Sequence, residues 1–570
     1  MSAERPLKLV ICWHMHQPSY RDAESGRYQL PWTYLHGIKD YVDMVALLEE
    51  VPAARAVVNF TPTLLEQISD YVEQISASRQ QQVELCDPLL QALNAEKLPS
   101  EAEAREGLIR AAMRANEKRL IHRFPTYHHL AELADRVLKH PAMLAYLSDQ
   151  YLADLLVWYH LAWLGETVRR SDTRVKRLMA KLHGYTLEDR RELLALIGEL
   201  LSSVVERYRR LAEAGQVELS VTPYAHPIVP LLLDTATTHE ALPEAPLPAL
   251  GAYPGGRERA LWHIEEGLRV FEKYFGFRPD GCWPSEGSLS EETLGLFAKA
   301  GFKWTASGET VLRNSLHRSE VSTHGCIHQP FRLDGQSLAC FFRDDGLSDL
   351  IGFTYADWHA EDAVNNLVHH LENIAVACKH EPNAVVSIIM DGENAWEYYP
   401  ENGYHFLSSL YQRLAEHPHI ELTTFSQCLK DKIQPQPLRH LVAGSWVYGT
   451  FSTWIGDKDK NRAWELLIEA KQAFDEVIAS GSLNDKQRAL AEHQLALCEG
   501  SDWFWWFGDY NPADSVKDFD RLYRLQLMAL YHALGLVPPT SLEQVISSGG
   551  GEAEAGGVMR RGSEHVAHHG

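Results

Sequence analysis

Short apolar runs that end abruptly in histidine or acidic residues are the feature that most limits how this chain can fold. LKLVIC, which begins at Leu7, leads into WHMHQP, and VVSIIM leads into DGENAW. VVSIIM is apolar at nearly every position rather than at alternate ones, which is typical of a strand buried on both faces of a parallel sheet. The sequence therefore predicts an α/β fold whose polar residues gather at the carboxyl ends of buried strands.

Helical patterns alternate with these strands. RERALWHIEEGLRVFEKYFG repeats apolar residues at spacings of three and four up to Phe275, and Gly276 ends the pattern. The segment GCWPSEGS, another helical pattern and the strand-like FKWTASG follow it. Helix and strand in this alternation indicate βαβ units and a parallel sheet.

The length of 570 residues is more than one hydrophobic core usually serves, so we expect more than one domain. We assign residues 1–432 to a large α/β domain, interrupted by a helical insertion at about 83–214. Residues 433–540 carry helical patterns such as NRAWELLIEAKQAF and are predicted to form a C-terminal helical domain that completes the cleft. The tail, 541–570, is rich in glycine and poor in apolar residues, and we predict it to be disordered.

Charge and hydropathy limit the partners. The net charge of −23 argues against nucleic acid and against an anionic membrane surface. No apolar stretch approaches the length of a membrane span, and the apolar run near the N-terminus is too short for a signal peptide. The eight cysteines are scattered without C-x-x-C spacing, which indicates neither a zinc site nor a disulfide framework. A cytoplasmic location is expected.

Two acidic residues follow strand-like segments and each has a tryptophan nearby. They are Glu286, close to Trp283 in CWPSEG, and Asp391, close to Trp396 in MDGENAW. Either carboxylate alone could simply begin or cap a helix. Together they fit glycoside hydrolysis, which uses one carboxylate as nucleophile or base and one carboxylic acid to protonate the leaving oxygen. Aromatic side chains would hold the sugar and raise the pKa of the acid by excluding water.

The remaining polar candidates leave several readings open. His14 and His16 share one face of a strand, where they could bind a divalent metal ion, contact substrate hydroxyls or serve a structural role. Glu218 in GQVELS also follows an apolar run, whereas His226 is more typical of a loop or packing residue. The aromatic segment SDWFWWFGDY is either core of the helical domain or, for a minority of its residues, cleft lining.

Five motifs occur in order along the chain: WHMHQP (His14, His16, Gln17), GQVELS (Glu218), GCWPSEGS (Glu286), IIMDGENAW (Asp391) and SWVYGTFSTWIGDKDKNRAW (Trp446, Trp454). Together they resemble glycoside hydrolase family 57, a family of α-glucan-active amylases and transglycosidases. Two further segments, FFRDDGLSDLIGF with Arg343 and SDWFWWFG with Asp502 and Trp503, resemble sugar-contacting parts of the same family. The resemblance spans roughly residues 7–540.

The resemblance implies a (β/α)7 barrel, a distorted relative of the TIM barrel, followed by a helical domain. It also implies a retaining mechanism with Glu286 as nucleophile and Asp391 as acid/base. The substrate would be an α-1,4-glucan or maltooligosaccharide, with no metal and no other cofactor. The sugar would then be contacted by His14, His16, Glu218, Trp283, Arg343, Trp446, Trp454, Asp502 and Trp503.

One departure concerns the kind of reaction. Where the family often has cysteine after the nucleophile, this chain has Gly287, as in longer amylase- and pullulanase-like members. We therefore expect amylase-like hydrolysis first, 4-α-glucanotransferase second and branching enzyme third. Two alternatives from other classes remain open. One is a metal-dependent hydrolase that uses His14 and His16, and the other is a non-catalytic glycan-binding protein.

Overall fold

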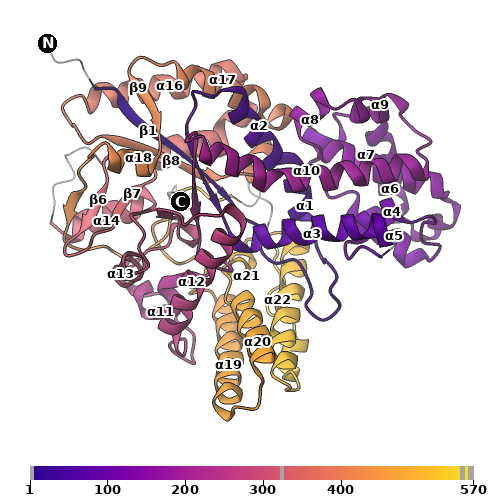
Figure 1. Ribbon diagram of the computed structural model, residues 1–570. Helices are drawn as coiled ribbons and strands as arrows, with labels where there is room; N and C mark the ends of the chain where they lie inside the picture. The colour runs from indigo at the N-terminus through magenta and orange to yellow at the C-terminus, as the bar shows by residue number, and fades with distance from the viewer. Residues whose placement is uncertain (1–4, 82, 321–326, 552–558, 563–570) are drawn as a thin grey trace, which may run out of the picture.

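A single ten-stranded sheet forms the centre of the molecule (Figure 1). The computed structural model describes residues 5–81, 83–320, 327–551 and 559–562. The strand order is β10-β6-β7-β5-β4-β3-β2-β1-β8, and β9 pairs with β1. The strands are β1 (Leu7–Met15), β2 (Ala56–Phe60), β3 (Val217–Val221), β4 (Gly281–Cys282), β5 (Trp304–Ser307), β6 (Phe331–Leu333), β7 (Ala339–Phe342), β8 (Val385–Asp391), β9 (Ile420–Thr423) and β10 (Gln436–Leu438).

Seven of these strands close into a ring. β1 to β5, β7 and β8 run parallel, and each neighbouring pair from β8 through β1 to β7 is hydrogen-bonded. The ring closes between β7 and β8, where Arg343 bridges Ser387 and the Asp344 N–H donates to the Ser387 carbonyl at 2.8 Å. The predicted (β/α)7 barrel is thus confirmed. β6, β9 and β10 extend the sheet outside the ring.

Alternation along the strands separates the inside of the ring from its outside. Val10 and Cys12 of β1 share a buried cluster with Val57, Phe341 and Ile389 of other ring strands. Leu9, Ile11 and Trp13 belong instead to the core that contains the surrounding helices. Because side chains alternate, His14 continues the inward-facing series of Val10 and Cys12 at the carboxyl end of β1.

Helices cover the outside of the ring (Figure 1). α12 ends at Gly276, whose φ of +81° suits glycine, as the helical pattern predicts. The flanking helices are α1 (Trp32–His36), α2 (Val42–Glu50), α3 (Pro62–Gln81), α11 (Val229–Leu233), α12 (Gly256–Phe275), α13 (Glu291–Lys299), α14 (Glu309–Arg318), α15 (Asp345–Asp349), α16 (Ala360–Ala377), α17 (Tyr404–Ala415) and α18 (Phe425–Lys430).

Two helical groups extend away from the ring. One lies between α3 and β3 in the chain and gathers on one side of the barrel, and the other follows β10 and projects below it in Figure 1. The first group is α4 (Pro88–Asn94), α5 (Ala102–Ala111), α6 (Pro125–Lys139), α7 (Asp149–Trp163), α8 (Glu166–Ser171), α9 (Thr173–Lys181) and α10 (Leu187–Glu213). The second is α19 (Lys458–Ser480), α20 (Asp485–Cys498), α21 (Asp502–Trp506) and α22 (Ala513–Ala533).

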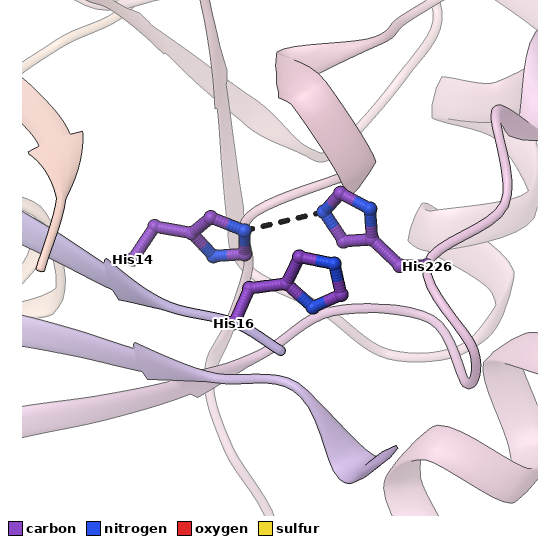
Figure 2. Close-up of side chains that lie close together, drawn as sticks. All are labelled: His14, His16 and His226. Carbon is purple, nitrogen blue, oxygen red and sulfur yellow. Dashed lines mark hydrogen bonds between the residues drawn. The ribbon is translucent and has the colours of Figure 1, made fainter. Parts of the chain in front are cut away.

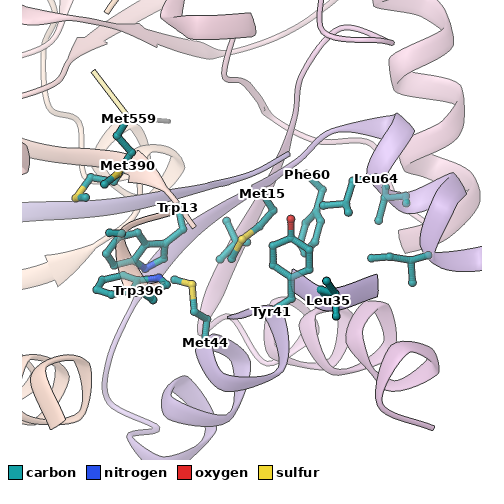
Figure 3. Packing of buried hydrophobic residues seen from close by; sticks show 14 of the residues in the cluster. Trp13, Met15, Leu35, Tyr41, Met44, Phe60, Leu64, Met390, Trp396 and Met559 are labelled. Carbon is teal, nitrogen blue, oxygen red and sulfur yellow. The ribbon is translucent and has the colours of Figure 1, made fainter. Parts of the chain in front are cut away.

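The tail differs from its predicted disorder. Ser547 is buried and donates to Asp459, and its backbone N–H donates to Asp520 of α22. Met559 is also buried, beside Met390 of β8 (Figure 3). Local composition does not reveal these contacts, because they are made with distant parts of the chain. Residues 552–558 and 563–570 of the predicted tail lie outside the described residues.

Within the described residues, no helix combines the length and apolar character that crossing a bilayer would require.

Candidate active site

A cavity of about 1000 Å³ opens at the carboxyl ends of the ring strands. The barrel contributes most of its wall, the first helical group contributes Arg110, Met113 and Leu138, and the second contributes residues from α21 and α22. A second cavity, beside Glu66 and Tyr224, is smaller, at about 320 Å³. The sequence-predicted residues that line it are His14, His16, Glu286, Arg343, Asp391, Trp446 and Asp502.

Glu286 lies in a sharp turn four residues beyond β4. Its φ of +56° is in the left-handed region, which is strained for a residue with a Cβ atom. Trp446 holds both ends of this residue, since its backbone N–H donates to the Glu286 carbonyl at 3.0 Å and its indole Nε1–H donates to Oε2 at 2.9 Å. The turn therefore aims the Glu286 carboxyl into the cavity in one orientation.

The space around Gly287, the residue after Glu286, is too small for a side chain. Its φ is +61°, and a Cβ atom would lie 2.9 Å from Cη2 of Trp283 and 3.2 Å from Cβ of Trp446. Cysteine at this position would have to push one of these two rings aside. Glycine in place of the family's frequent cysteine thus fits the tight packing of Trp283 and Trp446 behind the turn.

Asp391 is the last residue of β8 and stands opposite His14 of β1 in the sheet register. The Asn394 side-chain amide donates to its Oδ2 at 2.9 Å. Glu286 and Asp391 come from strand ends on different sides of the ring, yet both line the same cavity. A parallel barrel brings such residues together because all its strands end at the same rim.

Burial raises the pKa of both carboxyls, and the charge of Asp391 adds to this effect on Glu286. Burial raises the pKa of Glu286 well above its ordinary value, and the charge of Asp391 raises it further. Burial also raises the pKa of Asp391, although the Asn394 hydrogen bond and the nearby His16 and Arg343 partly offset this. Two neighbouring carboxyls of this kind hold one proton between them over a range of pH. The pair can therefore supply an acid and a nucleophile at the same time.

Three histidines meet beside the carboxyl pair (Figure 2). Nε2 of His14 lies 3.2 Å from Nε2 of His226, and the ring of His16 stacks on His226 with centroids 3.8 Å apart. Nδ1 of His14 donates to Oδ1 of Asn59 at 2.7 Å, which leaves Nε2 of His14 as an acceptor. His226 then donates from Nε2 to His14. Burial lowers the pKa of His14 to about 3 and lowers that of His226 well below its ordinary value, so both rings are neutral.

His16 and His226 also anchor the C-terminal helices to the barrel rim. Nε2 of His16 lies 2.7 Å from Oδ1 of Asp502, the first residue of α21. Nδ1 of His226 lies 2.7 Å from Oγ of Ser501, whose backbone N–H donates to the His226 carbonyl at 2.9 Å. These contacts fix α21 against the rim, and α21 supplies part of the cavity wall.

Arg343 is held by three partners at the closure of the ring. It pairs with Asp345 at 2.7 Å and with Asp349 at 2.8 Å, and its Nε–H donates to the Ile389 carbonyl at 2.8 Å. Its guanidinium lies 5.5 Å from the ring centre of Trp446. Arg343 thus fixes the indole that holds Glu286 and places a positive charge near Asp391.

Glu218 does not line the cavity, which corrects its predicted role in substrate binding. Its side chain points into the ring but lies one layer below His14, since Glu218 pairs with Val57 whereas His14 pairs with Asn59. Its carboxylate accepts hydrogen bonds from Nε1 of Trp304 at 2.6 Å and from the Ser426 backbone N–H at 2.9 Å. These contacts tie the lower end of the ring to α18, which is a structural role.

Three predicted tryptophans also lie behind the cavity wall rather than in it. Trp283, Trp454 and Trp503 are fully or almost fully buried and are absent from the lining. Trp283 packs against Trp446 at 5.2 Å, and Trp454 packs against Trp505 at 6.0 Å between ring centres. They support the residues that do face the cavity.

Sequence reasoning missed several lining residues. Trp505 and Trp506 line the cavity with Asp502, whereas Trp503 and Phe504 of the same helix are buried. The spacing of three and four from Asp502 is the helical signal that could have separated the two groups. Other missed residues include Trp32, Glu393 and Asn394, which line the cavity, and His226, which packs against His16.

Glu393 places a further carboxyl in the wall, two residues beyond Asp391. It is 2% exposed, and its Oε1 accepts from the Gln17 side-chain amide at 3.2 Å and from the His16 backbone N–H at 3.3 Å. Burial and the charge of Asp391 raise its pKa well above the ordinary value. Glu393 therefore links the end of β8 to the end of β1.

A parallel barrel with two carboxyls in one aromatic-lined cavity at its strand ends has the groups that cleavage of a glycosidic bond requires. The family model for glycosyl hydrolase family 57 matches residues 10–441. The chain belongs to this family. A search of curated proteins found no match.

Solved structures share the fold over most of the chain. A branching enzyme of this family from the hyperthermophilic archaeon Pyrococcus horikoshii is 17% identical, with a TM-score of 0.57 over 94% of this chain and 93% of that one. An α-amylase from Thermotoga maritima is 14% identical, with a TM-score of 0.56 over 94% and 96%. A 4-α-glucanotransferase from Thermococcus litoralis is 14% identical, with a TM-score of 0.52 over 94% and 61%.

Proposed function

We propose that this protein is a retaining enzyme that cleaves α-1,4-glucans, with Glu286 as nucleophile and Asp391 as acid/base. The observation that carries the proposal is the meeting of both carboxyls in one cavity beside Trp446, Trp505 and Trp506. Similar structures that are named as an amylase, a glucanotransferase and branching enzymes support the α-glucan substrate. A cytoplasmic location, favoured by the scattered cysteines, is part of the proposal.

In the proposed first step, an oxygen of ionised Glu286 attacks the anomeric carbon. The bond from that carbon to the leaving sugar breaks, and Asp391 gives its proton to the leaving oxygen. In the second step Asp391 takes a proton from water or from an acceptor hydroxyl. The resulting oxygen attacks the anomeric carbon, and the bond to Glu286 breaks. The Trp446 indole N–H stabilises Glu286 when it is ionised at the start and end of this cycle.

Hydrolysis and transfer differ in which acceptor reaches the intermediate. We expect wild-type protein incubated with pure maltoheptaose to give mainly shorter sugars, because hydrolysis is the first expectation from the sequence around Gly287. Chromatography of the products measures this directly. Products longer than maltoheptaose would assign transfer instead, and new α-1,6 links would assign branching. An intact substrate after long incubation would contradict the proposed function.

The histidine cluster favours one alternative from another class, a metal-dependent hydrolase. Its three rings could hold a metal ion, since ligand atoms of His14, His16 and His226 lie within 4.8 Å of one another. The same arrangement is also explained without a metal ion, because the rings of His14 and His226 are neutral and His226 donates a hydrogen bond to His14. We therefore expect activity to survive exhaustive dialysis against a chelator, assayed in chelated buffer. Loss of activity that zinc or another divalent ion restores would favour the metal-dependent enzyme.

A further inference from the structure

The last described residues of the chain, Met559 to Gly562, lie at the catalytic cavity. Met559 and Arg560 line it together with Glu286 and Asp391. Met559 is 6% exposed, and Figure 3 shows it next to Met390, the residue before Asp391. A segment far from the barrel in sequence thus forms part of the wall near the acid/base residue.

On the barrel side, the segment contacts the residues that hold Arg343. The Gly562 N–H donates to Oδ2 of Asp349 at 3.2 Å, and the Gly562 carbonyl accepts from the Tyr448 N–H at 3.1 Å. A Cβ atom on Gly562 would lie 2.4 Å from Cγ of Asp345 and 2.7 Å from Nη1 of Arg343. The backbone approaches this ion pair so closely that only glycine fits.

On the opposite side, Arg560 contacts the C-terminal helical group. Its Nη2 donates to Oδ1 of Asn511 at 2.6 Å. Its guanidinium lies 5.7 Å from the ring centre of Trp505 and 5.2 Å from that of Tyr510. Both distances are within the range of cation–π attraction. The segment therefore spans from the loop after β7 to the residues after α21, and it covers part of a tryptophan that lines the cavity.

We infer that Met559–Gly562 determines how long a glucan the cavity accepts. A sugar ring stacks on the open face of an aromatic side chain, and Arg560 occupies a face of Trp505. The segment thus occupies the place beside Trp505 where a further glucose unit would stack. This inference rests on the proposed action on α-glucans and adds the residues that limit substrate length. Displacement of the segment should free Trp505 for an additional glucose unit.

Two full-length variants test the inference. Arg560→Ala removes the guanidinium from Trp505, and Gly562→Val forces the segment away from the Arg343–Asp345 pair. We measure kcat/KM for maltotriose and for maltoheptaose and take the ratio of the longer to the shorter sugar. We expect both variants to raise this ratio by about 5- to 10-fold, the size of one added weak binding contact. The change should appear as a lower KM for maltoheptaose.

The matched control is Arg269→Ala, which removes an exposed arginine paired with Glu266 on α12. It should keep the wild-type ratio. If the wild type is active and both tail variants show an unchanged or lower ratio, the inference is overturned while the proposed function stands. If the wild type acts on neither sugar, the proposed function fails and the inference fails with it.

Discussion

Replacing Glu286 with glutamine is expected to lower kcat on an α-1,4-glucan on the order of 10⁴-fold or more, which corresponds to about 5 kcal/mol or more of lost transition-state stabilisation. The amide cannot form the covalent bond to the anomeric carbon. Its oxygen can still accept the hydrogen bond from Nε1 of Trp446, so the turn should keep its shape. Steady-state rates on maltoheptaose, with thermal unfolding as a check on folding, measure the effect.

The matched control for this variant is Glu292→Gln. Glu292 lies on α13 with about half its side chain exposed and pairs with Arg257 at the surface. Loss of a surface pair has little effect on stability, so this variant should keep wild-type rates. A Glu286→Gln enzyme that retains near-wild-type kcat would rule out Glu286 as the nucleophile.

Asp391→Asn is expected to lower kcat on maltoheptaose by about 10²- to 10⁴-fold, the contribution typical of general acid–base catalysis. The loss should shrink on a maltosyl fluoride, because fluoride leaves without being protonated. Intermediate should then accumulate, since no base activates water for the second step. A burst of fluoride release followed by a slow phase measures this directly. The control is Asp357→Asn, which changes an exposed surface residue.

The fluoride experiment also decides how the two carboxyls divide their roles. Burial favours the neutral form of Asp391, with which the proposed mechanism begins, whereas Asn394, His16 and Arg343 favour its ionised form. If Glu286→Gln rather than Asp391→Asn kept the burst with fluoride, the roles would be exchanged. The structure by itself is compatible with one shared proton on either residue.

The pH dependence of the Asp391→Asn burst follows from the charges. Glu286 must be ionised to attack, so the rate rises with pH through the pKa of Glu286. The charge of Asp391 raises that pKa in the wild type, so its removal should move the rise to lower pH. No fall at high pH is expected for this burst, because fluoride leaves without a proton from Asp391.

Local sequence was informative wherever a residue's role depends on its own strand. The apolar run before Asp391 predicts β8, and alternation along β1 places His14 and His16 on one face. Glu218 shows where this reasoning stops. It also faces the inside of the ring, but its depth depends on how β3 is shifted against β2. That register cannot be predicted from the sequence of one strand.

The aromatic residues show the same limit. Trp503 and Trp505 are two positions apart in one short helix, yet the first is core and the second faces the cavity. Their difference depends on how α21 docks against the rim through His16 and His226. Trp283 was predicted to touch sugar from its closeness to Glu286 in sequence. It packs instead behind the turn that Gly287 makes possible.

The sequence by itself determined the parallel sheet, the strand ends that bear polar residues, and the motif order that marks the family. These follow from hydrophobic patterns and residue types, which act over a few neighbouring positions. Only the tertiary structure decided which carboxyls share a cavity, which tryptophans line it, and that Met559–Gly562 returns to its wall. These depend on sheet register, ring closure and domain docking, which arise from contacts between residues hundreds of positions apart.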